Sequence, residues 1–563
     1  MISRGSRLLQ GLLLGTLLVL PGVPAAAAGP VAGPSLRVDV RHGRHAISAD
    51  IYGVNFASDI GSAGAVAKLG ITVDRWGGNS TTRYDWTTGI HNTGSDWYFE
   101  NIPPDTTTPP HLRLIAGDRS AGRHTVMTVP TIGWVPLTDS PDKHPYSCGF
   151  PTNTFPGQQS TDPYDDHCGN GVQGNGNALS GNDPTLTSRA VDPAYVASLI
   201  DDLVSRYGRA SARGVRYVEL DNEPSLWDST HRDVHPDPLT YDELTTRAIA
   251  YAKAIKAADP SAKVVGPSDW GWCAYLYSPA DPGHCSVGSD RTAHGGVAMA
   301  AWYLAQLKAY QDAHGTRLLD VFDEHYYPQS GVALRDAGSA SLQRQRLRST
   351  RSLWDPTYID ESWISDTASG GVAVQLIPRM RRWVDANYRG TGLGITEYNF
   401  GGLESLNGAL TQADVLGILG REDVRLATLW APGTASQPWA FAFRMFRGPG
   451  GSGSRFGTTS VLARSFRASS PSRPNGGQDS LSVYAAERSD RTLTVVVINK
   501  SSSALRSSLT LSGASFASHA RVWRYDGSDL HHIRQLAQAP VSAGVMRLTY
   551  PASSITLLVI PRR

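Results

Sequence analysis

The sequence predicts an α/β fold, a (β/α)8 TIM barrel with a second, smaller all-β sandwich domain. Three observations support this fold class. Short β-branched or apolar segments alternate with longer helical patterns over about 400 residues. A Gly-rich stretch, Gly448–Gly453, and a Ser/Pro-rich stretch, Ser469–Gly477, then mark a change in composition. The segments that follow alternate apolar and polar residues between turn residues, which is typical of a β-sandwich.

The N-terminus has the features of a secretory signal peptide. Arg4 and Arg7 precede an apolar run from Leu8 to Leu20, and the small residues Ala25–Ala28 follow. The run is interrupted by polar residues and is shorter than the roughly 18 apolar residues that a membrane span needs. We therefore expect residues 1–28 to be removed, and the mature protein to be extracellular without a membrane segment.

The smaller domain is predicted to be built from both ends of the chain. Residues 29–48 are expected to supply N-terminal strands that join the sandwich, because Ser35–Ser48 reads as a β-hairpin. The barrel is predicted over residues 49–447 and the C-terminal sandwich over residues 448–563. A domain assembled in this way is expected to be a scaffold packed on the barrel, since a free binding module is normally contiguous and tethered by a linker.

The barrel prediction rests on eight strand candidates and the helical patterns between them. The strand candidates are Ile51–Phe56, Ile71–Trp76, Thr125–Ile132, Arg216–Asp221, Lys263–Pro267, Leu319–Tyr326, Gly394–Tyr398 and Leu426–Trp430. The clearest helical patterns are Pro193–Tyr207, Tyr241–Ala258, Val297–His314 and Leu376–Asn387. A doubly wound nucleotide-binding fold is disfavoured, because the first strand is not followed by a Gly-rich phosphate turn.

Sandwich strands are predicted at five places. They are Leu481–Ala485, Leu493–Ile498, His519–Tyr525, Val545–Tyr550 and Ser554–Ile560.

A long loop-like insertion from Pro136 to about Val191 follows the third strand. On a barrel it would lie on the face that carries active sites and form a wall of the cleft. The four cysteines form two local pairs, Cys148 with Cys168 and Cys273 with Cys285. In an oxidising compartment such pairs are expected to be disulfides, and a zinc site is disfavoured because the spacing is not that of zinc ligands.

The composition excludes some classes of partner. The formal net charge of +2 gives no reason to expect nucleic acid or an anionic membrane surface as a partner. The chain contains 14 tryptophans and 22 tyrosines. So many aromatic residues in an exported protein are consistent with surfaces that stack on sugar rings. We expect a monomer.

Two strand-end glutamates are the candidate catalytic residues. Glu223 follows the fourth strand in the segment RYVELDNEPSLW, and Glu397 lies at the end of the seventh in GLGITEYNFGG. Catalytic side chains of barrels come from these strand ends. Glycoside hydrolysis needs one neutral carboxylic acid and one ionised carboxylate across the scissile bond. Asn222 precedes Glu223, and an asparagine there can bind the 2-hydroxyl of the sugar.

Several strings resemble glycoside hydrolase family 44, a family of endoglucanases and xyloglucanases within the large barrel clan of retaining glycosidases. The strings occur in the family's order and span most of the barrel. They are DRWGGNSTTRYDW (Asp74–Trp86), DWYFEN (Asp96–Asn101), LDNEPSLWDSTHRDVHP (Leu220–Pro236), FDEHYYPQ (Phe322–Gln329), LWDPTYIDESWI (Leu353–Ile364) and GITEYNFGG (Gly394–Gly402).

The resemblance implies a retaining mechanism, with Glu223 as acid/base and Glu397 as nucleophile. The two carboxyl groups are then expected roughly 5–5.5 Å apart. The substrate implied is a β-1,4-linked polysaccharide of the plant cell wall, either β-glucan or xyloglucan. The chemistry requires no cofactor.

Supporting roles are assigned to residues at other strand ends. Arg75 would keep the nucleophile ionised, or would form an ordinary ion pair with Asp74 or Asp85. Tyr326 or Tyr327 would donate a hydrogen bond to Glu397. Trp430 and Trp227 are candidate platforms for sugar rings, and the alternative for each is a place in the core.

A structural calcium site is considered in the Asp-rich insertion. The candidate ligands are Glu100, Asp162 and Asp165, because calcium prefers hard oxygen ligands. The alternative is a solvated acidic loop.

Two other functions are compatible with the sequence. The same mechanism could act on xylan or mannan. A non-catalytic carbohydrate-binding barrel belongs to a different class, and the paired glutamates weigh against it, since a binding protein has no use for an acid facing a nucleophile.

Overall fold

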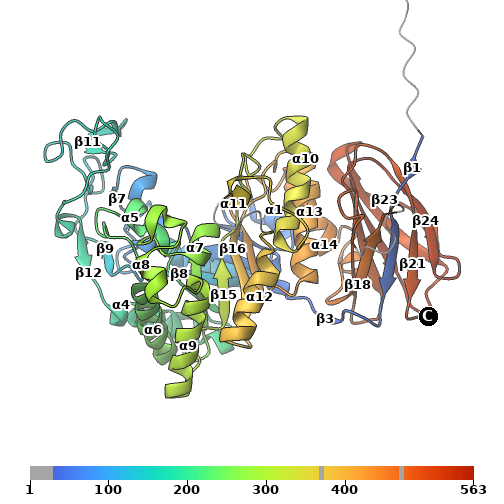
Figure 1. Ribbon diagram of the computed structural model, residues 1–563, viewed down its shortest axis with the longest axis horizontal. Helices are drawn as coiled ribbons and strands as arrows, with labels where there is room; N and C mark the ends of the chain where they lie inside the picture. The colour runs from blue at the N-terminus through green and yellow to red at the C-terminus, as the bar shows by residue number, and fades with distance from the viewer. Residues whose placement is uncertain (1–28, 367–372, 468, 470–474) are drawn as a thin grey trace, which may run out of the picture.

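The computed structural model describes residues 29–366, 373–467, 469 and 475–563, and the predicted signal peptide lies outside them. In this part of the chain, eight parallel strands close into a barrel in chain order, and an all-β domain packs on one side (Figure 1). The predicted fold class is therefore confirmed. The barrel strands are β4 (Gly53–Asn55), β5 (Val73–Trp76), β8 (His124–Val129), β13 (Tyr217–Leu220), β14 (Lys263–Asp269), β15 (Val321–Glu324), β16 (Gly392–Tyr398) and β17 (Leu426–Leu429).

The inside of the barrel is filled by layers of side chains, as the two-residue repeat of a strand requires. The lower layer is apolar and takes one residue from each of six strands: Val73, Val126, Tyr217, Val265, Val321 and Leu426. On five of these strands the buried residue two positions farther along is polar, namely Arg75, Thr128, Glu219, Asp323 and Thr428, and β16 adds Thr396. The barrel thus has an apolar floor and, above it, a polar layer just below the strand ends.

Helices cover the outside of the barrel where their patterns predict them. The helices α4 (Pro193–Tyr207), α6 (Tyr241–Ala258) and α12 (Leu376–Asn387) have the predicted bounds, and α9 spans Met299–His314. Helix α9 begins two residues later than predicted because Ala298 has an extended backbone. The start of α4 is fixed by Asp192, whose carboxylate accepts the N–H groups of Ala194 and Tyr195. None of the helices among the described residues is long and apolar enough to cross a membrane.

The insertion after β8 is more ordered than a plain loop. It contains β9 (Trp134–Pro136), β10 (Thr161–Asp162), β11 (Asp165–Gly169) and β12 (Ser188–Ala190), which pair as β9 with β12 and β10 with β11. The insertion rises from the barrel at the end away from the all-β domain (Figure 1). Both predicted disulfides are present, Cys148–Cys168 within the insertion and Cys273–Cys285 after β14.

The all-β domain contains three C-terminal strands that the sequence patterns did not predict. They are β18 (Thr459–Phe466), β21 (Leu505–Ser512) and β23 (Asp529–Pro540). Strand β23 is mostly exposed and polar, so its pattern resembles that of a loop. The strands at the predicted places are β19 (Leu481–Glu487), β20 (Leu493–Asn499), β22 (His519–Asp526), β24 (Val545–Tyr550) and β25 (Ser554–Ile560).

The N-terminal segment enters this domain, but the predicted hairpin over Ser35–Ser48 is wrong. Strand β2 (Ser35–Asp39) lies between β21 and β18, parallel to β21 and antiparallel to β18. Strand β3 (His45–Ala46) also pairs with β18 and not with β2. Because β18 offers a partner along its whole length, both short strands bind to it in succession.

The all-β domain and the barrel share a buried interface. Along β20, Val495 and Val497 belong to the core between the sheets, whereas Val496 and Ile498 belong to the barrel core. Helices α13 (Leu406–Arg421) and α14 (Pro438–Arg447) form the barrel side of this contact. The buried Lys500 ammonium lies 3.0 Å from the Asp414 carboxylate of α13. The domain is therefore packed on the barrel rather than tethered beside it.

Candidate active site

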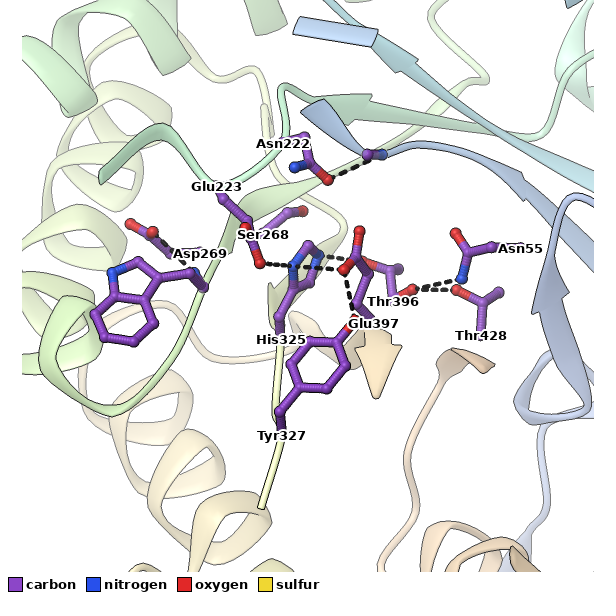
Figure 2. Close-up of polar contacts among 12 residues, drawn as sticks. Asn55, Asn222, Glu223, Ser268, Asp269, His325, Tyr327, Thr396, Glu397 and Thr428 are labelled. Carbon is purple, nitrogen blue, oxygen red and sulfur yellow. Dashed lines mark hydrogen bonds and ion pairs between the residues drawn. The ribbon is translucent and has the colours of Figure 1, made fainter. Parts of the chain in front are cut away.

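Glu223 and Glu397 meet at the mouth of the barrel. Glu223 lies in the turn after β13, and Glu397 is near the end of β16. One carboxylate oxygen of each glutamate and a ring nitrogen of His325 all lie within 4.8 Å of one another. Figure 2 shows the two carboxylates pointing toward each other with His325 between them. The two residues predicted as a catalytic pair are thus brought together.

The turn that carries Glu223 is held in an unusual backbone conformation. Both Asp221 and Glu223 have positive φ, 66° and 49°, which residues with a side chain rarely adopt. The Glu223 N–H donates to the Ser268 carbonyl at 3.0 Å. The Asp221 carboxylate accepts the N–H groups of Thr131 and Ile132. These bonds hold the turn so that the Glu223 side chain points across the barrel mouth.

Glu223 is a carboxyl group suited to remain protonated near neutral pH. Its side chain is 15% exposed, and one oxygen lies 2.9 Å from His325 Nδ1. Burial raises its pKa to about 7, while the Arg75 guanidinium opposes that shift and Asp96 adds to it. A carboxyl with this pKa can donate a proton to a leaving group and can later accept one.

Glu397 accepts a hydrogen bond at each of its two carboxylate oxygens. Arg75 Nη1 donates to one oxygen at 2.7 Å, and the Tyr327 hydroxyl donates to the other at 2.7 Å. The two glutamates therefore have different environments, as an acid and a nucleophile require.

Arg75 connects Glu397 and Asn222 with the polar layer below them. It is fully buried, and its guanidinium donates to Glu219 at 2.6 Å, to Asn222 Oδ1 at 2.9 Å and to Asn55 Oδ1 at 3.1 Å. The carboxylates of Glu219 and Glu397 raise the pKa of Arg75 against the effect of burial. The predicted alternative partners, Asp74 and Asp85, are not its partners, since Asp74 accepts the Ala57 N–H and Asp85 binds Arg189.

Glu219 compensates the buried charge of Arg75 from the layer below. It accepts hydrogen bonds from the hydroxyl groups of Thr128 at 2.5 Å, Thr396 at 2.7 Å and Ser268 at 2.9 Å. Although burial raises its pKa, Arg75 and these donors hold the pKa of Glu219 below its ordinary value. Glu219 thus remains a fixed negative charge beneath the site.

His325 is a site residue that sequence reasoning did not single out. It is 0% exposed, and Nε2 lies 3.2 Å from the Thr396 hydroxyl on the side opposite Glu223. Burial lowers its pKa, which favours the neutral ring. It follows β15 directly, within the string FDEHYYPQ. Applying the strand-end criterion that selected the glutamates would also have selected this histidine.

The structure distinguishes between the two tyrosines and between the two tryptophans proposed as supporting residues. The main-chain N–H of Tyr326 donates to the Glu397 carbonyl at 2.9 Å. Its side chain does not reach the Glu397 carboxylate, because its hydroxyl lies 3.3 Å from Asp360 and its ring is buried. Tyr327 makes the contact instead. Trp227 is 1% exposed and packs against His235 and Arg247, so it has no free face for a sugar ring. Tyr326 thus binds the main chain of Glu397 and Tyr327 binds its carboxylate, while Trp227 lies in the core, the alternative given for it.

Trp430 lies at the barrel mouth, where its main-chain N–H donates to the carbonyl of Tyr398, the residue after Glu397. It is partly exposed and meets Phe56 edge to face at 6.1 Å between ring centroids. Gly78 allows this position, because a Cβ there would lie 2.6 Å from the indole ring. A cavity of about 340 Å³ opens next to it, lined by residues that include Asn55, Phe56 and Trp430. The indole therefore borders space that a sugar could occupy.

Asn222 is positioned by its neighbours. Its Oδ1 accepts from Arg75 and from the Gly78 N–H, at 2.9 and 3.1 Å, and its amide group donates to Asn79 Oδ1 at 3.2 Å. Asn79 in turn donates to the Asp96 carboxylate at 3.1 Å. The asparagine is thus fixed beside Glu223 at the edge of the site.

The carboxylates of Glu100, Asp162 and Asp165 form a second, separate cluster beside the insertion. Both carboxylate oxygens of Glu100 and one of Asp162 are buried without a hydrogen-bond partner. Burial and the nearby Asp162 and Asp165 charges raise the pKa of Glu100 to about 8. Buried, unpaired carboxyl oxygens that converge in this way suit a hard cation such as calcium. Cys168, which lies within reach, is oxidised in a disulfide and has no thiolate to offer.

Comparisons with known proteins agree with the fold. The model of glycoside hydrolase family 44 matches residues 90–330. Endoglucanase A of Paenibacillus lautus is 30% identical over 561 residues, which cover 96% of this chain and 74% of that protein.

Two solved structures share both the barrel and the all-β domain. CelM2, a bifunctional glucanase-xylanase from a metagenome library, is 39% identical with a TM-score of 0.88, over 95% of this chain and 100% of the other. A family 44 xyloglucanase of Paenibacillus polymyxa is 28% identical with a TM-score of 0.75, over 94% of this chain and 100% of the other.

Proposed function

The chain belongs to glycoside hydrolase family 44 and is a glycoside hydrolase, and we propose that it is a secreted, retaining endo-β-1,4-glucanase and xyloglucanase. The observation that carries the proposal is the approach of Glu223 and Glu397, whose oxygens lie within 4.8 Å of each other. Retaining enzymes place these groups about 5–5.5 Å apart, whereas inverting enzymes need about 6.5–9.5 Å to admit a water molecule.

In the first step a Glu397 oxygen attacks the anomeric carbon while Glu223 gives its proton to the glycosidic oxygen. The bond from the anomeric carbon to the leaving sugar breaks, and a glycosyl ester forms on Glu397. Arg75 and Tyr327 hold the attacking carboxylate in place. Glu223 is left ionised, and its pKa of about 7 means that ionisation costs little near neutral pH.

In the second step the ionised Glu223 takes a proton from water. The water oxygen attacks the anomeric carbon, the ester bond breaks, and Glu397 is released as a carboxylate. Two inversions give net retention of the β configuration. Trp430 is proposed as a sugar platform next to the nucleophile, and Asn222 as a contact near the acid/base.

A substrate panel tests this proposal. The wild-type enzyme should hydrolyse carboxymethyl-cellulose and xyloglucan, and a Glu223→Gln variant should lose most of this activity, because the amide cannot donate a proton to the leaving oxygen. Xylan and mannan belong in the same panel. If wild type and variant were equally inert on every polysaccharide, the non-catalytic carbohydrate-binding alternative would replace the proposal.

Xylan is the second candidate substrate. The 39% identical CelM2 is described as both a glucanase and a xylanase. The catalytic pair described above is compatible with either backbone. Hydrolysis of xylan at a rate comparable with that of β-glucan would extend the proposal to both polysaccharides.

We also propose that calcium binds Glu100, Asp162 and Asp165 and stabilises the insertion, without taking part in the chemistry. Chelation with EGTA should lower the thermal midpoint by about 2–3 °C, since a ligand at 100 times its Kd contributes ~2.7 kcal/mol and a chain of this length has a large entropy of unfolding. The measurement is a melting curve with and without EGTA. A Glu100→Gln variant should lose the calcium-dependent shift, and an Asp142→Asn variant in the same insertion should keep it. An identical midpoint in EGTA and in excess calcium would contradict the metal site.

Export is proposed on two grounds. The disulfides Cys148–Cys168 and Cys273–Cys285 are typical of proteins that fold in an oxidising compartment. A polysaccharide substrate of the cell wall also lies outside the cell that makes the enzyme.

A further inference from the structure

Two large aromatic side chains lie exposed next to each other, Trp97 in the loop before β7 (Asn101–Ile102) and Tyr164 in the turn between β10 and β11. Trp97 is 41% exposed and Tyr164 is 76% exposed. Their ring centroids are 6.4 Å apart, and the planes are inclined by only 30°. Single exposed aromatics are common on protein surfaces, but two stacked rings from segments distant in sequence gather exposed apolar area at one place.

The pair is connected to the acid/base side of the catalytic site. Asp96, directly before Trp97, accepts two hydrogen bonds from the Asn79 amide at 3.1 Å. Asn79 accepts one from Asn222, the residue before Glu223. The Asp96 charge is also near enough to raise the pKa of Glu223. Trp97 therefore directly follows a residue that borders Glu223, on the acid/base side of the site.

The backbone after Trp97 is held in place by the buried Phe99, which leaves the Trp97 indole at the surface. Tyr98 and Phe99 have positive φ, 52° and 56°. Phe99 is 0% exposed and packs edge to face against Phe150 of the insertion at 4.9 Å. The Phe99 N–H donates to the Gly94 carbonyl at 2.8 Å. The segment is thus fastened on both sides of the exposed indole.

Both rings belong to residues that lie close in sequence to the proposed cation ligands. Trp97 precedes Glu100 by three residues, and Tyr164 lies between Asp162 and Asp165. The Tyr164 N–H donates to Asp162 Oδ1 at 3.1 Å. The unpartnered oxygens of Glu100 and Asp162 would repel each other without a cation and attract each other through one. Figure 1 shows β7 (Asn101–Ile102), which follows Glu100, and β11, which begins at Asp165, on the same side of the molecule.

We propose that Trp97 and Tyr164 form a platform for sugar rings on the leaving-group side of the cleft, and that the cation held by Glu100, Asp162 and Asp165 keeps the two rings together. The ligand is a soluble β-1,4-linked glucan chain that also occupies the catalytic site, because the flat, C–H-rich faces of its rings pack on aromatic surfaces. The inference rests on the proposed function and adds a binding site to it.

The test measures binding separately from catalysis. In a Glu223→Gln background, titration calorimetry with cellohexaose gives the Kd without turnover. Trp97→Ala and Tyr164→Ala should each weaken binding about three- to ten-fold, the loss expected for one aromatic stacking contact. Tyr310→Ala, on the outer surface of α9, is the matched control and should leave the Kd unchanged. In the active enzyme, kcat/KM on an aryl cellobioside should change less than two-fold in both platform variants, because that substrate does not reach them.

EGTA tests the role of the cation. It should weaken cellohexaose binding by a similar factor in the Glu223→Gln background, and should have no further effect once both Trp97 and Tyr164 are alanine. Normal cellohexaose binding by the platform variants would overturn the platform, even if the polymer is still hydrolysed. Weaker binding by these variants with no effect of EGTA would overturn the role of the cation. Failure of the proposed function would look different, since the wild type would then cleave no β-glucan.

Discussion

Replacing Glu397 with alanine is expected to lower kcat by about 10⁴-fold or more, because no other group can form the covalent intermediate. Glu397 is the carboxylate to which Arg75 and Tyr327 both donate at 2.7 Å. Without it the site keeps its acid and its sugar-binding residues but has no nucleophile. Initial rates on carboxymethyl-cellulose and on an aryl cellobioside measure the loss.

Added azide identifies the role of Glu397. In the space left by Glu397→Ala, an azide ion can attack the anomeric carbon directly and give an α-glycosyl azide from an activated substrate. The control is Glu404→Ala, an exposed glutamate in the loop after β16, which should keep wild-type activity. Full activity of Glu397→Ala, or a β-glycosyl azide from it, would contradict its assignment as nucleophile.

Replacing Glu223 with alanine is expected to lower activity on polysaccharides by about 10²–10⁴-fold, the usual contribution of a general acid. The loss should be much smaller on aryl glycosides whose leaving group needs no proton. In this variant azide attacks the glycosyl ester and gives a β-glycosyl azide. An equal loss on both kinds of substrate would contradict the role of Glu223 as acid.

The pH dependence of kcat/KM on polysaccharides is expected to follow the protonation of Glu223. Glu223 must be protonated to donate, and burial raises its pKa to about 7. Below pH 7 the acid form dominates, so kcat/KM on polysaccharides should fall as the pH rises through about 7, by ten-fold per unit at higher pH. The Glu223→Gln variant should lack this alkaline decline. A decline that stays at the same pH in the variant would assign it to another group.

The barrel and its catalytic pair were predictable because both depend on local pattern. The apolar strands are short and regularly spaced, and helix starts such as Asp192-Pro193 carry explicit capping residues. Once the strands are numbered, Glu223 and Glu397 fall at the same rim of the barrel. Their approach to within 4.8 Å is a consequence of the closed sheet.

The positions of the side chains that support the pair depend on structural details that the pattern of apolar and polar residues does not encode. Tyr326 and Tyr327 are adjacent, so they point to opposite sides, and the end of β15 decides which one faces Glu397. Trp227 follows a 3-10 turn over Pro224–Leu226, which directs its ring into the core. Strand β21 was missed because serine and threonine separate its leucines, although Leu505, Leu509 and Leu511 are all buried.

The most direct test of the retaining mechanism is ¹H NMR of the first products of hydrolysis, recorded before mutarotation. The Glu223–Glu397 separation within 4.8 Å predicts that the newly formed reducing end appears first as the β anomer, with the α anomer growing in later. Initial appearance of the α anomer would contradict the double displacement, and with it the assignment of Glu397 as nucleophile.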